Sequence, residues 1–258
     1  MKQNFIKVGA GLLLLATVIL VLTSGLLTLP SKPAAHSATK GFAVIELFTS
    51  EGCSSCPAAD AAVERIAAAN PGKVFVLGFH VDYWNRLGWT DSFSKTAYSA
   101  RQRAYADYFK LEGVYTPQVV VNGSNQMVGS DNGRLQKAVV AGIDKAVNRP
   151  VELLASQPAA NTVKVAYQLD TLPSNTDVNI ALLQIVAQTH VQRGENKGRT
   201  LKHIDIVQDF KTLNNSSKTG AVVFDLPRGI SANNCKLLLY VQHRQTKEIT
   251  AVAETLIR

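Results

Sequence analysis

Two cysteines separated by two residues are the feature of this sequence best suited to chemistry. They stand in Cys53-Ser54-Ser55-Cys56, directly before Pro57. At this spacing one thiolate can attack a disulfide, and the second can then resolve the mixed disulfide that forms. The pair closes too short a loop to add much chain-entropy stabilisation, which favours redox chemistry over stapling. Half of a zinc site and a merely structural disulfide are the two alternatives.

A redox site of this kind needs a strand before the cysteines and a helix after them. The apolar run over 42–48 predicts the strand, 49–52 is a turn signal, and the alanine-rich stretch 57–69 predicts the helix. Free N–H groups and the positive end of the helix dipole stabilise a thiolate at a helix N-terminus. We therefore expect Cys53 to be the nucleophile and Cys56 to be the resolving thiol.

The segments that follow predict an α/β domain over residues 41–150. Further strands are expected at 73–79, 118–121 and 126–128, and further helices at 91–110 and 131–147. The resulting order is βαβαββα. Residues 151–258 look different, because polar turns separate strand-like segments. They predict a smaller antiparallel β-sandwich-like domain with strands at 163–169, 178–188, 220–226, 236–243 and 249–257.

Three charged or titratable side chains near the pair are candidates for tuning its reactivity. Glu46 is the lone charge of the first strand, and His80 and Asp82 follow the second strand at the same sheet edge. A buried carboxylate can accept a thiol proton, and a histidine can relay one. The alternatives are an outward-facing Glu46 and a capped loop with a hydrogen-bonded His80. Trp84 and Trp89 are expected only to pack under the next helix.

Two other features are interpreted conservatively. The polar loop 193–199 is expected to be a solvated hairpin loop, with contact to an acidic partner as the alternative. Cys235, the third of only three cysteines, is expected to be a buried inert thiol, with a partner-linked thiol as the alternative. We predict no metal site and no cofactor, because there is no second Cys-x-x-Cys and the spacing of His80 and His190 demands no metal.

The N-terminus predicts export across a membrane. Lys2 and Lys7 precede an uncharged apolar run from Val8 to Leu29, and 30–40 is a linker rich in Pro, Ala and Ser. The run is long enough to span a bilayer but also contains a core of signal-peptide length. Residues 1–29 are therefore either a cleaved export signal or a retained anchor in the inner membrane. Both alternatives give a periplasmic or secreted protein that meets the membrane only through this segment.

The net charge of +8 does not predict a nucleic-acid surface. Half of it lies in residues 1–40, and 41–150 are almost balanced. Binding to nucleic acid needs clustered Lys and Arg, so we expect a solvated basic face instead. The 46% hydrophobic content is sufficient for a sizeable core.

Motifs spread along the chain also resemble those of a known family. They lie at 44–50 with 52–60, 79–84 with 88–89, 100–105, 114–118, and 193–196 with 198–201. Together they resemble a family of secreted bacterial proteins catalogued as a domain of unknown function, the 1223 family, within the thioredoxin-like superfamily. The resemblance implies a thioredoxin-like fold but supplies no substrate. His203 stands where the later histidine of the family is expected, and Cys235 matches no family pattern.

A thioredoxin-like fold gives Thr116-Pro117 a specific place. In such folds a cis proline lies beside the cysteines, and the residue before it meets the substrate backbone. We expect Thr116-Pro117 to be cis and to bind substrate, with an ordinary strand-opening proline as the alternative.

These observations predict an exported thiol–disulfide oxidoreductase that uses the Cys53/Cys56 pair on protein thiols or disulfides, with or without a redox partner protein. The β-rich second half would present or select these partners. The alternative is a non-enzymatic binding module in which the cysteine pair holds a metal or forms a structural disulfide.

Overall fold

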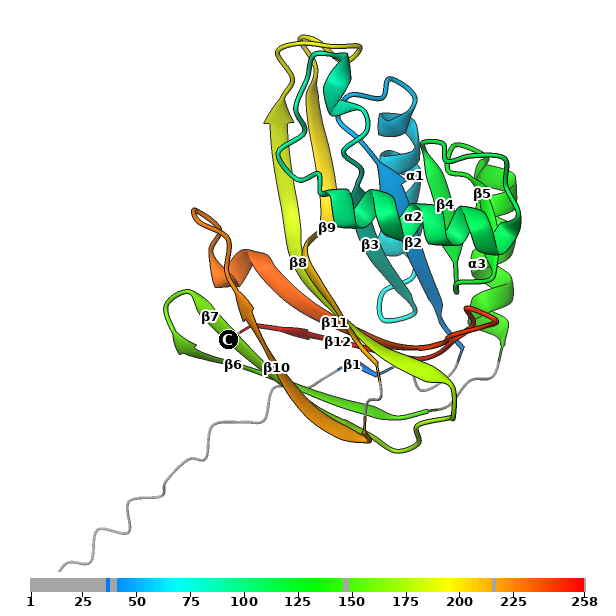
Figure 1. The fold of residues 1–258 in the computed structure, drawn as a ribbon, viewed down its shortest axis with the longest axis vertical. Helices are drawn as coiled ribbons and strands as arrows, with labels where there is room; N and C mark the ends of the chain where they lie inside the picture. The colour runs from blue at the N-terminus through cyan, green and yellow to red at the C-terminus, as the bar shows by residue number, and fades with distance from the viewer. Residues whose placement is uncertain (1–35, 38–40, 146–148, 215–216, 258) are drawn as a thin grey trace, which may run out of the picture. The chain divides into compact units, whose positions relative to one another are not determined.

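The computed structural model describes residues 36–37, 41–145, 149–214 and 217–257 (Figure 1). The predicted export segment, and the predicted linker apart from 36–37, lie outside the described residues. Residues Lys32–Arg258 form one compact unit. Within the described ranges, no helix is both long and apolar enough to cross a membrane.

The first half of the chain has the predicted order of elements. They are β2 (Ala43–Thr49), α1 (Cys56–Ala69), β3 (Val74–His80), the short helix η1 (Asn85–Leu87), α2 (Thr96–Phe109), β4 (Gln118–Val121), β5 (Asn125–Val128) and α3 (Asn132–Asp144). Strands β2 and β3 are parallel, while β4 is antiparallel to both β2 and β5. The βαβαββα order expected from the sequence is therefore confirmed.

The second half is almost entirely β-structure. Its elements are β6 (Val151–Ala159), β7 (Thr162–Leu169), β8 (Thr176–His190), β9 (Thr200–Leu213), β10 (Thr219–Asp225), the short helix η2 (Ala232–Asn234), β11 (Cys235–His243) and β12 (Ile249–Leu256), with β1 (His36–Ser37) paired to β12. Strands β6 and β9 were not predicted from the sequence. Strand β9 escaped it because several of its buried side chains, including His203, Asp205 and Gln208, are polar and interrupt the apolar pattern.

The two halves share a sheet. A nine-stranded mixed sheet has the order β1-β12-β11-β8-β9-β3-β2-β4-β5, and β10-β7-β6 form a separate antiparallel layer. The junction is the parallel contact of β3 with β9, where Gly78 pairs with Ile206. A Cβ on Gly78 would lie 3.3 Å from the carbonyl oxygen of Ile204, so a side chain would crowd this close approach. The predicted boundary near residue 150 thus divides the chain but does not divide the large sheet.

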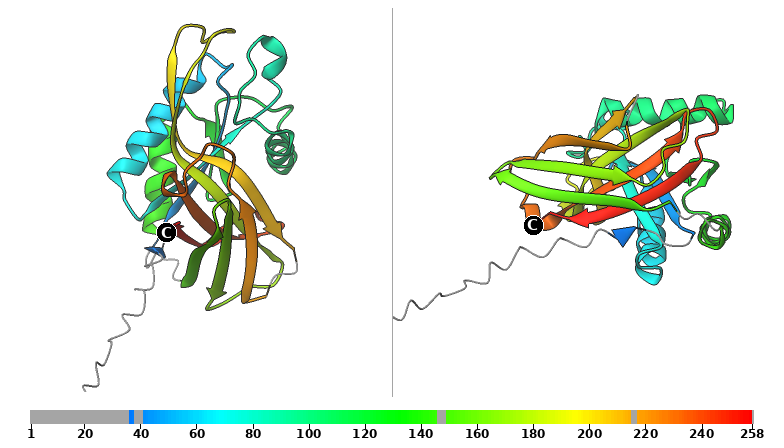
Figure 2. Two further views of the ribbon diagram at one scale, coloured as in Figure 1. Left: turned by 90° about the vertical axis from the view of Figure 1, so that its left-hand side faces the viewer. Right: turned by 90° about the horizontal axis from the view of Figure 1, so that it is seen from below.

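The two faces of β2 belong to different cores, because strand side chains alternate. Val44 and Phe48 pack on the face covered by α2, with side chains from β9 and β11. Ile45 and Leu47 pack on the face covered by α1 and α3. Figure 2 shows α1 and α3 on the side of the sheet opposite to α2. A third core fills the space between the β6–β7–β10 layer and strands β8, β11 and β12.

Helix α2 begins later than the sequence suggested. The expected start was Asp91, but the first helical residue is Thr96 and its N-cap is Lys95. Asp91 is buried and its carboxylate accepts hydrogen bonds from elsewhere. The capping signal was therefore misread, because this carboxylate serves the site rather than the helix.

Candidate functional site

A disulfide joins Cys53 and Cys56 in the loop that leads from the carboxyl end of β2 into α1. Cys56 is the first residue of α1, Ser55 is its N-cap and Pro57 follows in the first turn. The Cys56 N–H donates to the carbonyl oxygen of Cys53 at 3.3 Å, and the Cys53 Sγ lies 3.4 Å from the Ser55 Oγ. The predicted strand–loop–helix placement of the pair is thus confirmed.

The Thr116-Pro117 peptide bond is cis, as the sequence predicted. Trp84 connects it to the cysteine loop. The Trp84 indole N–H donates to the Thr116 Oγ1 at 2.8 Å, and a Cβ built on Gly52 would lie 3.2 Å from the Trp84 Cβ. The expectation that Trp84 only packs is therefore wrong, because its ring nitrogen has a specific partner in the cis loop.

Behind the disulfide lies a cluster that was not predicted from the sequence: the buried Glu51 and His203 and the partly buried Asp60. The His203 Nδ1 lies 3.0 Å from an Asp60 oxygen, and its Nε2 lies 3.7 Å from the Glu51 Oε1. Asp60 also accepts a hydrogen bond from the Thr49 hydroxyl, and the other Glu51 oxygen accepts from the Trp89 indole N–H at 2.7 Å. Trp89, like Trp84, therefore does more than pack.

The position of Asp60 gives this cluster its chemical interest. Asp60 is four residues after Cys56 on α1, and side chains at this spacing are neighbours on one helix face. The sequence contained this signal, since an acid at the fourth position after the second cysteine follows from helical periodicity alone. His203 could be found only through the family resemblance, because it comes from β9 in the other half of the chain.

The protonation of His203 is controlled by its carboxylate neighbours. Burial alone would lower the pKa of His203, but Asp60 and Glu51 outweigh burial and raise it to about 9. His203 is therefore an imidazolium at neutral pH, held between the buried Glu51 and the partly buried Asp60. The facing atoms, His203 Nε2 and Glu51 Oε1, are buried and have no hydrogen-bond partner within the described part of the chain.

His80 belongs to the same neighbourhood. Its Nδ1 lies 2.7 Å from the Asp91 Oδ2, and its ring contacts the His203 ring edge-on with centroids 4.7 Å apart. Asp91 also accepts a hydrogen bond from the Glu51 N–H at 2.9 Å. Burial would raise the pKa of Asp91, but His80 and the hydrogen bonds to the carboxylate keep it below its ordinary value. His80 is thus hydrogen-bonded to Asp91, and Asp91 links it to the backbone of Glu51, two residues before Cys53.

The loop between β8 and β9, residues 191–199, covers the cysteine loop. The Asn196 side-chain amide donates to the carbonyl oxygens of Glu51 at 2.8 Å and Cys53 at 2.9 Å, and the Ser54 N–H donates to a Glu195 oxygen at 2.9 Å. Arg199 holds the Asn196 oxygen at 2.7 Å. Figure 1 shows this loop at the same end of the sheet as the β2–α1 loop.

The expected solvated hairpin loop is confirmed for 193–199 except at Asn196, since the other residues of this range are exposed. Asn196 is fully buried, and Cys53 and Cys56 are each only 1% exposed. The 191–199 segment is solvated over part of its length, but its Asn196 inserts into the backbone around Cys53. At 1% exposure, the two cysteines are closed to a substrate sulfur in this conformation, and the 191–199 loop is bonded directly to the backbone beside them.

The other two predicted tuning residues lie elsewhere. Glu46 is fully buried on the α2 face of β2, where the Arg101 Nε at 2.6 Å and the Tyr105 hydroxyl at 2.6 Å donate to it. The outward-facing alternative for Glu46 is therefore wrong. Asp82 accepts hydrogen bonds from Thr96 and Ser99 near the start of α2, which lower its pKa. Within the described residues, neither carboxylate hydrogen-bonds to the cysteine loop.

Cys235 is fully buried in the second half, as expected. Burial raises the pKa of its thiol to about 11, so it is a poor nucleophile. Among the residues that the structure describes, no group of three or more His, Cys, Asp and Glu side chains is arranged to hold a metal ion.

Fold and site define a mixed α/β protein with a buried disulfide at the end of a sheet strand. The chain belongs to the family described as protein of unknown function (DUF1223), whose model matches residues 44–242. It is similar to the crystal structure of protein AGR_C_4864 from Agrobacterium tumefaciens, with 27% identity over 85% of this chain and 96% of that chain and a TM-score of 0.61. No curated protein matches it.

A domain of the outer membrane lipoprotein Omp28 from Porphyromonas gingivalis is a weaker match. It is 17% identical and covers 43% of this chain and 88% of that chain. Its TM-score of 0.27 is too low to indicate a shared fold.

Proposed function

We propose that this protein is an exported thiol–disulfide oxidoreductase with a thioredoxin-like fold, acting on protein thiols or disulfides through Cys53 and Cys56. The observation that carries the proposal is the disulfide at the N-terminus of α1 together with the cis Thr116-Pro117 peptide, since Trp84 lies against Gly52 of the cysteine loop and hydrogen-bonds to Thr116. Thr116 and Pro117 are proposed to bind substrate backbone. The apolar segment 8–29 supports export, with a periplasmic or secreted location.

Each exchange balances between the cysteine pair and its substrate, and turnover needs a second thiol or disulfide that returns the pair to its starting state. In the reductive direction, the Cys53 thiolate attacks a substrate disulfide, forms a mixed disulfide and releases one substrate thiolate. The Cys56 thiolate then attacks the Cys53 sulfur and releases the second substrate thiolate, which leaves the Cys53–Cys56 disulfide. In the oxidative direction, a substrate thiolate attacks this disulfide and the same steps run in reverse.

The acid–histidine cluster supplies the proton handling that these steps need. Cys56 must lose its proton before it can resolve the mixed disulfide, and Asp60 is the carboxylate one helical turn away. His203 faces that carboxylate through Nδ1 and Glu51 through Nε2, so its positive charge is placed between the two acids. We therefore place the tuning role on Asp60, Glu51 and His203, with His80 supporting His203 through ring contact.

The experiment that tests the proposal is a trapping assay with a protein disulfide such as insulin. Wild type should reduce insulin with dithiothreitol as electron donor. Cys56→Ser should accumulate a mixed disulfide through Cys53, visible as an adduct by mass spectrometry, because the resolving thiol is absent. Cys53→Ser should form no such adduct and should have no activity. Full activity in Cys53→Ser, or no turnover by wild type in either direction, would exclude this proposal.

A structural disulfide in a binding module is the second candidate, and the 1% exposure of each cysteine favours it. The reduction potential of the pair separates the two candidates. Equilibration with glutathione buffers should give a value in the range of known oxidoreductases, roughly −270 to −120 mV, if the pair is catalytic. A value below about −300 mV is typical of structural disulfides.

A further inference from the structure

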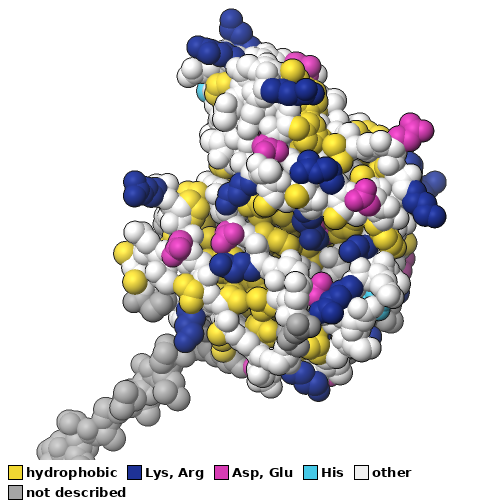
Figure 3. Space-filling view, viewed as in Figure 1, with side chains coloured by type: hydrophobic (Ala, Val, Ile, Leu, Met, Phe, Trp, Pro, Cys, Tyr) yellow, Lys and Arg dark blue, Asp and Glu magenta, His cyan; other side chains and the backbone are white. Residues whose placement is uncertain are grey.

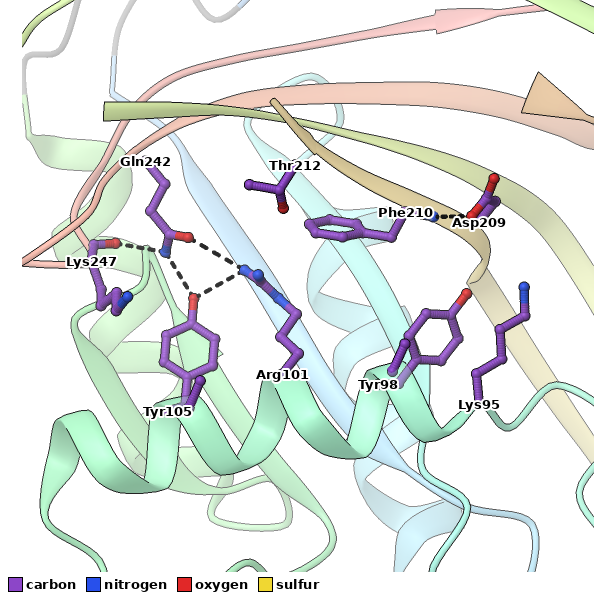
Figure 4. A pocket seen from close by; sticks show the side chains of 11 residues that line it. Lys95, Tyr98, Arg101, Tyr105, Asp209, Phe210, Thr212, Gln242 and Lys247 are labelled. Atoms are coloured by element: carbon purple, nitrogen blue, oxygen red, sulfur yellow. Dashed lines mark hydrogen bonds between the residues drawn. The ribbon is translucent and has the colours of Figure 1, made fainter. Parts of the chain in front are cut away.

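A cavity lies on the face of the large sheet opposite to α1, between α2 and strands β9 and β11. Its volume is about 300 Å³, and its walls include Tyr98, Arg101, Tyr105, Phe210 and Gln242 (Figure 4). None of the residues around it belongs to the cysteine loop or to the cluster behind it. A volume of this size is at the lower end of the range for small-molecule sites, which are mostly apolar with a few fixed polar groups.

One polar group in the cavity, the Arg101 guanidinium, is fixed in place. Its Nε and Nη2 donate to the two Glu46 oxygens, and Nη2 also donates to the Tyr240 hydroxyl at 2.6 Å. The guanidinium carbon stacks over the Phe210 ring, 4.7 Å from its centroid, and over the Tyr105 ring at 5.3 Å. Its remaining Nη1 has no hydrogen-bond partner within the described part of the chain.

The charges around the cavity favour an anion. Because Glu46 neutralises Arg101, the net charge is decided by Lys95, Lys247 and Asp209, which also line the cavity. Lys95 donates to a backbone carbonyl and keeps its charge, and no described residue pairs with the Lys247 ammonium. The Asp209 Oδ1 accepts a hydrogen bond from the Phe210 N–H, and the Asp209 Oδ2 lies 3.8 Å from the Lys211 ammonium.

The surface view shows the surroundings of the cavity. In Figure 3, hydrophobic side chains gather at the centre of the same face, and both basic and acidic side chains lie around them. An apolar floor whose lining carries two lysines and one aspartate besides Arg101 suits a ligand that has an apolar body and a negative head group.

We propose that this cavity binds a small organic carboxylate with an aromatic or aliphatic body. The body would lie against Tyr98 and Phe210, and the carboxylate would meet Arg101 and Lys247. The proposal is independent of the redox proposal, because it concerns another face of the sheet and is tested by binding alone.

The test is calorimetric titration of the whole protein with three probes that share one body. They are 3-phenylpropionate, 3-phenylpropan-1-ol and 3-phenylpropylamine, and octanoate serves as an aliphatic acid. Both acids should bind at one site, with the alcohol at least about ten-fold weaker and the amine without measurable binding. Lys247→Gln should weaken the acids several-fold and leave the alcohol unchanged.

A matched pair on α2 locates the site. Ala104 lines the cavity and is exposed, whereas Ala100 is exposed on the same helix but does not line it. Ala104→Trp should abolish binding of both acids, and Ala100→Trp should leave it unchanged, with both variants folded by circular dichroism. The proposal is overturned if neither acid binds, if the alcohol binds as tightly as the acid, or if Ala104→Trp binds like wild type.

Discussion

His203 should make the stability of this protein depend on pH in a specific direction. Its pKa is about 9 in the folded chain against about 6.5 in the unfolded chain. A raised pKa stabilises the fold fully below about pH 6.5, and this contribution is lost as the pH rises through about 9. A difference of about 2.5 pKa units corresponds to roughly 3 kcal/mol, since each unit is worth about 1.4 kcal/mol.

The perturbation is His203→Gln, which keeps a polar side chain of similar size but removes the charge. The assay is urea unfolding of wild type and variant, both oxidised, at half-unit steps from pH 6 to pH 10. The free energy of unfolding of wild type should exceed that of the variant by roughly 3 kcal/mol more at pH 6 than at pH 10. Other titrating groups change both proteins alike and cancel in the difference.

A matched control is His190→Gln, since His190 is an exposed histidine at the end of β8. Its stability curve should run parallel to that of wild type. If the His203→Gln curve also runs parallel to wild type between pH 6 and pH 10, then His203 is not an imidazolium held by Asp60 and Glu51, and the proposed proton handling loses its basis.

Three further predictions follow from other contacts. Asn196→Ala removes two hydrogen bonds that hold the covering loop, so dithiothreitol should reduce the Cys53–Cys56 disulfide about thirty-fold faster, given roughly 1 kcal/mol per bond; the exposed Asn233→Ala is the control, and equal rates would contradict the covering role. Glu46→Gln leaves the Arg101 charge uncompensated and should lower the free energy of unfolding by about 3 kcal/mol, measured by urea unfolding. Cys235, buried and with a pKa of about 11, should resist iodoacetamide at pH 8 in the folded protein and react only after unfolding, as mass spectrometry would show.

The βαβαββα half could be predicted because its local signals agree with its tertiary structure. Strand β2 is apolar apart from Glu46 and its last residue Thr49, α1 is rich in alanine after Pro57, and Asn70 ends α1. The predicted start of α2 was wrong because here the local signal and the tertiary structure disagree. Asp91 has the side chain of a good cap, but its carboxylate is bound by His80 and the Glu51 N–H, contacts that no local pattern encodes.

The composition of the site was harder to predict because its parts are distant in sequence. Cys53 and Cys56 could be predicted from their spacing, and the cis Pro117 from its place in the order of strands and helices. Asn196 and His203 come from β8–β9, about 140 residues after the cysteines, and the loop between these strands looks like any solvated hairpin loop. Only the pairing of β9 with β3 brings them to the cysteine loop, and that pairing joins halves that the sequence presents as separate.

The junction of β3 with β9 therefore bears on what the second half of the chain does. Without β9, strand β3 would be an open edge, and unpaired edges are prone to aggregation. Strand β9 also carries His203, and the loop before β9 carries Asn196. The β8–β9 hairpin therefore supplies three things: a partner for the edge of β3, a buried cation, and a loop bonded to the backbone beside the disulfide. If the pair is catalytic, the β-rich half is part of the redox site, and a substrate that displaces the 191–199 loop acts on both halves at once.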